Sequence, residues 1–268
     1  IATGDDGMHA DATLTINNGD IRITRSYEGL ESAVITINGG NIYIVANDDG
    51  VNVAGGVDGS GTMRGAPGGG RPNRQQPGAP PAGMPGQDAF TYTGNQYLYI
   101  NGGYLVVDAA GDGIDVNGAV EMTGGVVIVH GPTANMNAAL DYDAGFTISG
   151  GLLAAVGSAG MAQAPGGAST QNSLLINFNA VQQAGTLVHI QDSQGAAILT
   201  FAPNKAHQSL AFSSPQLVAG ETYTVYLGGS SSGEAVDGLV QNGVYLPGME
   251  YTTFTVESIV TIIGGRMR

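Results

Sequence analysis

The chain has 268 residues, 45 of them glycine, and its 22 acidic against 8 basic residues give a formal net charge of −14 at pH 7. This charge repels nucleic acid and anionic membrane surfaces, so we expect no nucleic-acid partner. The absence of cysteine excludes disulfides and thiolate metal sites, and no apolar run is long enough for membrane insertion. The chain begins at Ile1 without an initiator methionine, as expected of a processed or excised fragment.

The first part of the chain repeats a short pattern. A glycine beside an acidic residue marks the repeats, and a second glycine marker follows with similar spacings. Both sets fit a period of about 22 residues once an insertion in the third repeat is allowed. The first marker is found at Gly7, Gly29, Gly50 and Gly113, with Ala139 in the fifth position.

Within each repeat, apolar and polar residues alternate on both sides of an Asn-Gly-type turn. Leu14 and Ile16 precede the first such turn, and Ile21 and Ile23 follow it. Alternation with period two is typical of short half-buried strands. Three short strands in about 22 residues predict an all-β fold class, a parallel β-helix of about five coils. A leucine-rich repeat has a similar period but needs a helical segment and regular leucines, which are missing.

Two domains are expected. Residues 1–158 carry the repeats, interrupted by a Gly/Pro-rich insertion at 55–96 that is typical of a long loop. Residues 159–268 lose the period and alternate like antiparallel strands. Because an open β-helix end exposes core and unpaired backbone, we expect this C-terminal antiparallel β module to cap or pack on the helix.

Acidic residues gather beside the first glycine marker. Stacked repeats would place them in columns about 4.8 Å apart, where neighbouring unit charges repel by about 1 to 4 kcal/mol. Carboxylate and amide oxygens are the ligands that Ca²⁺ prefers, so the columns predict calcium as a bound cofactor. A solvated acidic edge without metal is the alternative. The predicted metal ligands are Asp6, Glu28, Glu31, Asp49, Asn52, Asp112, Asp115, Asp141 and Asp143.

Outward tyrosines and two arginines are the candidate polysaccharide contacts. A flat aromatic ring suits a pyranose, although the same tyrosines could instead pack beneath the insertion. Two exposed arginines give little affinity against salt screening, so we expect acidic polysaccharide to need bridging calcium. The predicted ligand-binding residues are Arg22, Arg25, Tyr43, Tyr97, Tyr99 and Tyr104.

Several segments together carry a family resemblance. The recurring "(D/E)G(I/L/V)…(T/I)N(G/N)GxIxI", the Gly/Pro-rich insertion, "GTLVHIQDSQGAAILTF" and "GETYTVYLGG" resemble the carbohydrate-binding parallel β-helix family of clostridial-type cell-surface proteins. The resemblance covers nearly the whole chain. It implies a pectate-lyase-like right-handed parallel β-helix, bound calcium, an extracellular or cell-surface location, and non-catalytic binding of plant cell-wall polysaccharide, acidic pectin-type or cellulose.

Two other functions stay open. A polysaccharide lyase or other pectin-active enzyme of the same fold is the first, although a calcium-dependent lyase needs a strong base, and Arg22 and Arg25 are the basic residues on the repeat strands. No catalytic residue is predicted. A structural or adhesive surface solenoid is the second, to which the aligned Thr15 and Thr36 point. The sequence sets no oligomeric state.

Overall fold

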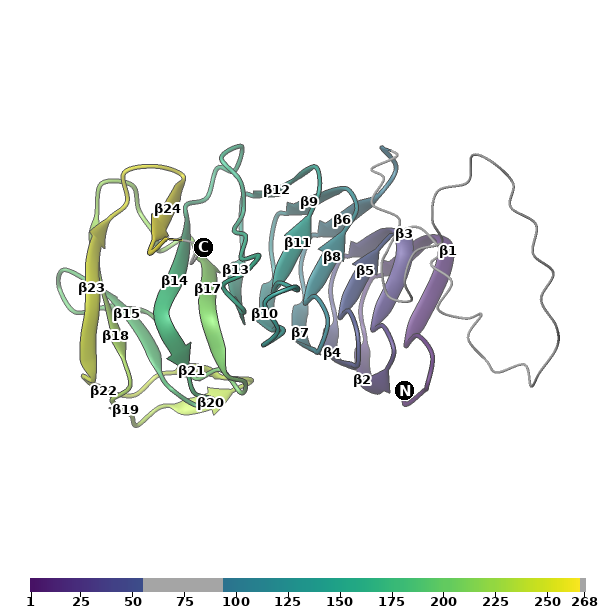
Figure 1. Ribbon diagram of the computed structural model, residues 1–268. Helices are drawn as coiled ribbons and strands as arrows, with labels where there is room; N and C mark the ends of the chain where they lie inside the picture. The colour runs from purple at the N-terminus through teal and green to yellow at the C-terminus, as the bar shows by residue number, and fades with distance from the viewer. Residues whose placement is uncertain (55–93, 266–268) are drawn as a thin grey trace, which may run out of the picture.

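The computed structural model describes residues 1–54 and 94–265 (Figure 1). Every regular element in these residues is a strand, so the all-β prediction is confirmed. The strands form two eight-stranded sheets, a six-stranded sheet and a two-stranded sheet, named here sheets 1 to 4 in that order. The described residues contain no helix that could cross a membrane.

Sheet 1 is parallel and forks at its central strand, β3 (Leu30–Ile37). One end of β3 pairs with β5 and the other end with β6, while β1 pairs along its opposite edge. Two arms therefore leave the same edge of β3. The remaining strands are β1 (Met8–Ile16), then β5 (Val51–Val53), β8 (Ile114–Val116) and β11 (Leu140–Tyr142) in one arm, and β6 (Tyr97–Ile100), β9 (Ala119–Met122) and β12 (Gly145–Ile148) in the other.

Sheet 2 is parallel in its first part and changes direction at β13. Pairing is parallel from β2 to β13, antiparallel from β13 through β17 to β14, and parallel again to β24. The order is β2 (Asp20–Ser26), β4 (Asn41–Ala46), β7 (Tyr104–Ala109), β10 (Val126–His130), β13 (Leu152–Gly157), β17 (His207–Ser213), β14 (Ser173–Gln182) and β24 (Val260–Ile263).

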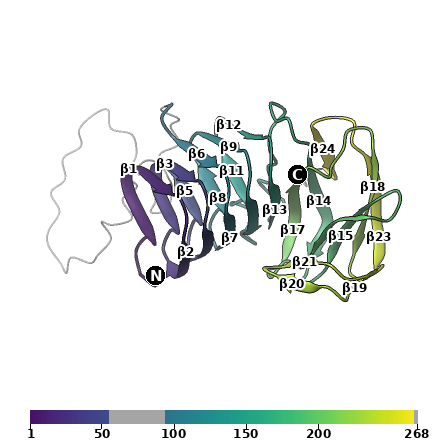
Figure 2. The same cartoon turned by 180° about the vertical axis from the view of Figure 1, so that it is seen from behind.

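Sheet 3 is antiparallel and lies at the end of the molecule opposite to β1 (Figure 2). Its order is β20 (Glu234–Val236), β21 (Leu239–Gln241), β16 (Ala197–Phe201), β15 (Val188–Asp192), β18 (Thr222–Leu227) and β23 (Met249–Thr255). Sheet 4 is the pair β19 (Ser230–Ser231) and β22 (Tyr245–Leu246).

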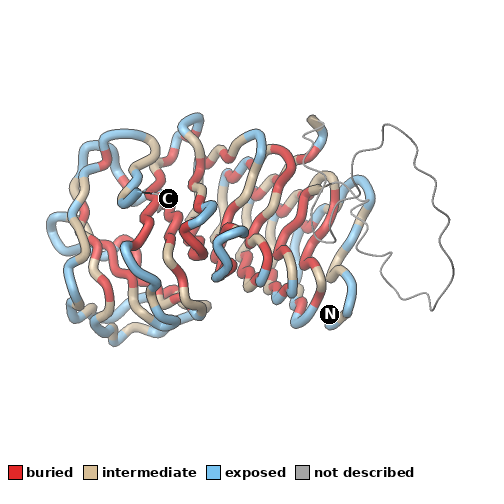
Figure 3. The backbone as a smooth tube through the Cα atoms, in the orientation of Figure 1, coloured by how far each residue is buried: buried red, intermediate tan, exposed pale blue. Residues whose placement is uncertain are grey.

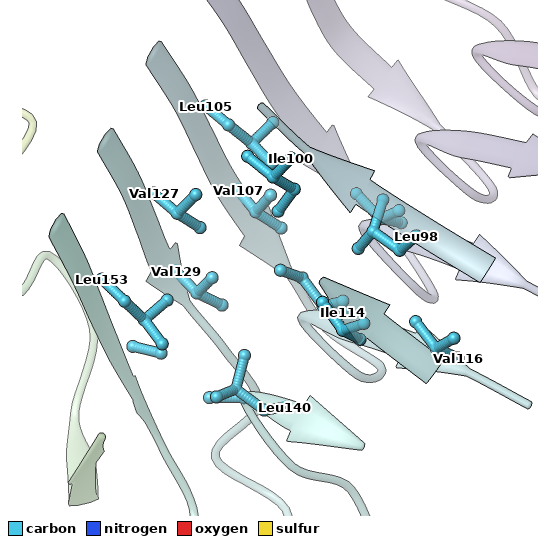
Figure 4. Close-up of a cluster of buried hydrophobic side chains, with 14 of the residues drawn as sticks. Leu98, Ile100, Leu105, Val107, Ile114, Val116, Val127, Val129, Leu140 and Leu153 are labelled. Atoms are coloured by element: carbon cyan, nitrogen blue, oxygen red, sulfur yellow. The ribbon is translucent and has the colours of Figure 1, made fainter. Parts of the chain in front are cut away.

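Equivalent residues of successive repeats pair directly in the parallel ladders. Ile42, for example, pairs with Ile21 on one side and with Leu105 on the other. Alternate residues point inward, so aliphatic side chains of sheet 2 face those of sheet 1 in a shared core. Figure 4 shows this arrangement, with Val127 and Leu153 on one side and Ile114 and Leu140 on the other.

The predicted architecture, a right-handed parallel β-helix of about five three-stranded coils with a separate antiparallel cap, is wrong. β1 and β3 run straight through two strand positions, and the strands of these positions join one forked sheet. Sheet 2 continues past β13 into the C-terminal strands, so these strands extend a repeat sheet instead of forming a separate cap.

The reason lies in the residues between the two strand positions. Where the chain bends between them a glycine is present, Gly118 before β9 and Gly145 at the start of β12, whereas no glycine lies between Leu30 and Ile35 or in the matching part of β1. β1 and β3 therefore continue without a break, and β1 takes up its extra residue in a bulge between Ala10 and Thr13. The predicted boundary between residues 158 and 159 falls in the connection from β13 to β14 and stays a prediction. Most of the predicted insertion at 55–96 lies outside the described residues.

A second core lies between the outer face of sheet 2 and sheet 3. Ile128 and Ala154 on sheet 2 are fully buried there with Val188 and Phe201 of sheet 3. Figure 3 shows the buried residues following the strands through both halves of the molecule. The consecutive apolar runs "VVIV" and "LLAAV" predict this burial, because a strand covered on both faces loses its polar alternation.

The first glycine marker is explained by close contact between backbones. A Cβ added at Gly29 would lie 2.2 Å from the carbonyl oxygen of Gly50 and 2.3 Å from Ile44 Cγ2. Gly7, Gly50 and Gly113 are similarly crowded by the next repeat. Side chains at these positions would therefore push adjacent repeats apart.

We predict that Gly29→Ala destabilises the protein by about 1 to 3 kcal/mol or more, the usual cost of overpacking. Gly4→Ala is the control, since nothing lies within 4 Å of a Cβ at that position. Urea unfolding measures both variants. Equal midpoints for Gly29→Ala and wild type would contradict the close-contact explanation.

Candidate functional site

The ladders of sheet 1 bring polar and acidic residues of successive repeats side by side. Direct pairing joins His9 to Glu31, Glu31 to Asn52, Asn52 to Asp115 and Asp115 to Asp141. A second line lies three residues earlier in the chain, next to the crowded glycines. We name the two lines together the acidic row: Asp6, Glu28, Asp49 and Asp112 with His9, Glu31, Asn52, Asp115 and Asp141.

The middle of the acidic row is buried. Glu31 and Asn52 are 0% exposed and Glu28 is 3% exposed. Asn52 Nδ2 donates to Glu28 Oε1 at 2.8 Å, whereas the buried Asn52 Oδ1 accepts no hydrogen bond within the described part of the chain. Buried carboxylates need compensating hydrogen bonds or cations, because burial removes the water that would solvate them.

Some carboxylates also join one repeat to the next through backbone amides. Asp6 Oδ1 accepts from the Glu28 amide at 3.4 Å, and Asp49 Oδ1 accepts from the Asp112 amide at 2.6 Å. Asp112 Oδ1 accepts from the amide of Ala138. These bonds fix carboxylate oxygens of one repeat against the backbone of the next.

Two groups in the acidic row have the geometry of a metal site. Their potential ligand atoms lie within 4.8 Å of one another in each group. The first group is Asp6, His9 and Glu31, and the second is Asp49, Asp112 and Asp115. The oxygen-rich second group fits a hard divalent cation, and the imidazole of the first group widens the choice of metal.

His9 links three acidic side chains. Its Nδ1 bonds to Glu31 and lies 3.7 Å from an Asp6 oxygen, while its Nε2 lies 3.2 Å from Asp11 Oδ1. The Glu31 hydrogen bond is the main cause that raises the pKa of His9. A protonated His9 therefore offsets part of the negative charge at this end of the row.

Asp141 and Asp143 lie at the other end and belong to neither group of three within the described residues. Asp141 accepts from Gln163 Nε2 at 3.2 Å. Burial, followed by the neighbouring Asp143, raises the pKa of Asp141. Asp143 itself is exposed. The structure thus places these two predicted ligands outside both potential metal groups.

The predicted sugar contacts divide among separate places. Arg22 and Tyr43 lie together on sheet 2, with the guanidinium carbon 4.2 Å from the ring centroid. The Tyr104 ring is 6.1 Å from that of Tyr43. Arg25 does not join them, because its Nε donates to the Thr3 carbonyl at 3.1 Å.

Tyr97 and Tyr99 form a different surface on β6 of sheet 1. Their rings stack with centroids 5.8 Å apart and an interplanar angle of 15°. Both line a cavity of about 380 Å³ together with residues of β9 and β12. The two half-buried rings offer an aromatic platform of the kind that packs against a pyranose.

A second cavity, of about 340 Å³, lies where sheet 2 meets the turn between β20 and β21. We name it the hairpin pocket; its polar lining is Arg22, Thr24, Tyr43, Asp108, His130, Asn204 and Asp237. Asp237 and Gly238 both have positive φ, 51° and 87°, as in the two-residue hairpin turns that favour Asp-Gly.

The turn is anchored to sheet 2 by two hydrogen bonds. Tyr104 donates its hydroxyl to Asp237 Oδ2 at 3.0 Å, and the Asp237 carbonyl lies 3.3 Å from His130 Nε2. His130 Nδ1 accepts from the Asn204 amide at 3.4 Å, which leaves the ring proton on Nε2 for Asp237. These bonds hold Asp237 in place as one wall of the hairpin pocket.

The other wall is fixed by the single lysine of the chain. Lys205 Nζ lies 3.1 Å from Asp108 Oδ1 and donates to the Ala109 carbonyl at 2.5 Å. Asp108 Oδ2 accepts from Asn204 Nδ2 at 3.2 Å. The sequence analysis missed Asp108, His130, Asn204 and Asp237. Only "VDGL" gave a local signal, since Asp-Gly between apolar residues predicts a hairpin turn.

We predict that acid destabilises the protein in part through His130 and His207. Burial lowers the pKa of both below the usual 6.5, so the folded state holds them neutral. Their contribution is complete above about pH 6.5 and declines as the pH falls toward their lower folded-state pKa, because the unfolded chain binds the protons first. Urea unfolding between about pH 8 and 5 in EDTA should show a shallower decline in His130→Gln/His207→Gln. An unchanged slope would contradict this assignment.

Comparison of the chain with protein-family models, with curated proteins and with solved structures gives no match. The resemblance stated from the sequence therefore stays a prediction. The acidic row and the two cavities are interpreted from their own geometry and chemistry.

Proposed function

We propose that this chain is a non-catalytic carbohydrate-binding protein of the cell surface or extracellular space, with calcium bound in its acidic row. The observation that carries the calcium part is the pairing of carboxylates from successive repeats, with two groups whose ligand atoms lie within 4.8 Å of one another. Polysaccharide, acidic pectin-type or cellulose, is the proposed partner.

The donor set suits calcium. Carboxylate oxygens of Asp49, Asp112 and Asp115 converge, and Asn52 adds a buried amide oxygen that accepts no hydrogen bond within the described residues. Calcium takes about six to eight such oxygen ligands. A cation here would offset the repulsion between stacked carboxylates, which is about 1 to 4 kcal/mol per neighbouring pair of unit charges.

Burial favours a structural role for this calcium over a bridging role. Glu28, Glu31, Asp49 and Asn52 are each at most 7% exposed, so polysaccharide cannot reach a cation held among them. Asp112 and Asp115 are only partly exposed. A cation in the row would instead tie the repeats together, as the amide bonds of Asp6 and Asp49 already do.

The sugar-binding part is supported by the two concave surfaces. The stacked Tyr97 and Tyr99 provide an aromatic platform, and the Glu121 carboxylate in the same cavity can accept from sugar hydroxyls but repels an acidic sugar, so this surface suits a neutral glucan such as cellulose. The hairpin pocket combines an apolar surface with several polar side chains and contains the exposed Arg22. The tyrosine platform lies on sheet 1 and the hairpin pocket on sheet 2, so a neutral and an acidic sugar would bind at separate sites.

We predict that calcium raises the melting temperature by about 5 to 10 °C at 100 times its Kd, from the linkage of binding to folding. Asp115→Asn keeps the side-chain volume, removes a carboxylate of the group assigned to calcium, and should lose most of this increase. Asp20→Asn is the control, because Asp20 is exposed and bonds to Asn41 outside both groups. Thermal melts in EDTA and in calcium test this, and identical wild-type midpoints would refute the calcium proposal.

We also predict binding without turnover. Wild-type protein should be retained on cellulose or polygalacturonate beads, with Tyr97→Ala/Tyr99→Ala lowering retention on cellulose. Incubation with polygalacturonate and calcium should release neither unsaturated products nor new reducing ends. Sustained release of either would show that the chain is an enzyme and overturn the binding proposal.

A further inference from the structure

We infer that the hairpin pocket binds one uronic acid unit of an acidic polysaccharide, with Arg22 contacting the carboxylate directly and without a bridging cation. This inference rests on the proposed function and assigns its acidic ligand to a site. The pocket was not expected from the sequence, because its walls come from Asn204 and Asp237, far along the chain from Arg22.

Arg22 supplies the positive charge of the pocket. Among the described residues it has no carboxylate within 4.0 Å, whereas Lys205 is held by Asp108. The Tyr43 ring lies under the guanidinium at 4.2 Å and holds it in place by a cation–π contact. A planar guanidinium can bind a carboxylate through two parallel hydrogen bonds. Tyr43 therefore positions Arg22 and is not itself the stacking platform for the sugar.

The walls supply hydrogen-bond acceptors. Asp237 Oδ2 is used by Tyr104, and Asn204 Nδ2 is used by Asp108. Within the described residues no hydrogen bond reaches Asp237 Oδ1 or Asn204 Oδ1, so both oxygens remain for ligand hydroxyls. The anchoring bonds fix both side chains before a ligand arrives, which lowers the entropy cost of binding.

This arrangement matches a sugar acid better than a neutral sugar or a simple anion. A uronate carries a carboxylate at one edge of the ring and hydroxyl donors at others, which complement Arg22 and the two wall acceptors. A phosphate or a simple carboxylate would meet Arg22 but leave the two wall acceptors unused. A cavity of about 340 Å³ is at the small end of ligand pockets, about 300 to 1,000 Å³, and suits one unit or two.

The pocket is separate from the acidic row in its composition. None of its lining residues belongs to either potential metal group. Binding there should consequently survive removal of calcium, provided the fold stays intact. The opposite was expected from the sequence, where Arg22 and Arg25 stood as two exposed cations. Only Arg22 has the aromatic support and the concave surroundings that strengthen a charge contact.

The test is isothermal titration of the full chain with trigalacturonate and with the neutral galactose trimer, in calcium and in EDTA. Arg22→Gln should weaken trigalacturonate binding about tenfold or more, the usual loss for a charge-assisted hydrogen bond, and leave the neutral trimer unchanged. Asn204→Ala should weaken both sugars, since it removes a hydroxyl acceptor. Arg25→Gln, on the same strand but outside the pocket, is the matched control and should bind like wild type.

The outcomes separate this inference from the proposed function. Trigalacturonate binding that survives in EDTA and falls in Arg22→Gln but not in Arg25→Gln supports the pocket. Equal affinity in wild type and Arg22→Gln, or binding abolished by EDTA at a temperature where circular dichroism shows a folded chain, overturns it while leaving polysaccharide binding intact. Failure of wild type to bind any of these sugars, cellulose or polygalacturonate overturns the proposed function itself.

Discussion

The structure depends on one constraint, the stacking of each repeat residue on its own equivalent at the spacing of a parallel ladder. Where the residue is aliphatic, as in the ladder through Ile42 and Leu105, the stacking builds a continuous core. Where it is glycine, as at Gly29 and Gly50, backbones come close enough to exclude a Cβ. Where it is acidic, the same rule concentrates charge that the fold must offset. Core, backbone contact and acidic row are three consequences of one spacing.

The two faces of sheet 2 divide structural and binding roles. Its inner face belongs to the first core and its outer face is covered by sheet 3 over β10 and β13. That cover ends at the turn formed by Asp237 and Gly238, beyond which β2 and β4 are open. The hairpin pocket thus lies at the boundary between the part of sheet 2 that sheet 3 covers and the part that it leaves uncovered. Its position follows from where the second core stops.

Parts of this arrangement could be predicted from the sequence and parts could not. The spacing of Gly7, Gly29 and Gly50 predicts which residues occupy equivalent positions in successive repeats. Because equivalent positions pair in the parallel ladders, it also predicts the neighbours in the acidic row. The number of strands per repeat does not follow from the period, because it depends on the residues between the two strand positions, which include Gly118 in one repeat and no glycine between Leu30 and Ile35 in another. The pocket wall does not follow either, because Asp237 meets Tyr104 across 133 positions of chain without any repeat to relate them.

The reversal of strand direction at β13 changes which residues become neighbours in sheet 2. In the parallel ladders, each residue lies beside the equivalent position of the neighbouring repeats, so a substitution in one repeat is felt by the same position in the next. At β13 the antiparallel partner β17 places Ser213 opposite Leu153 and Phe212 opposite Ala154. Position in the repeat no longer sets the neighbour there. The sequence repeat and the parallel pairing of the repeats thus end at the same strand, and the chain beyond it carries the unrepeated turns that hold Asn204 and Asp237.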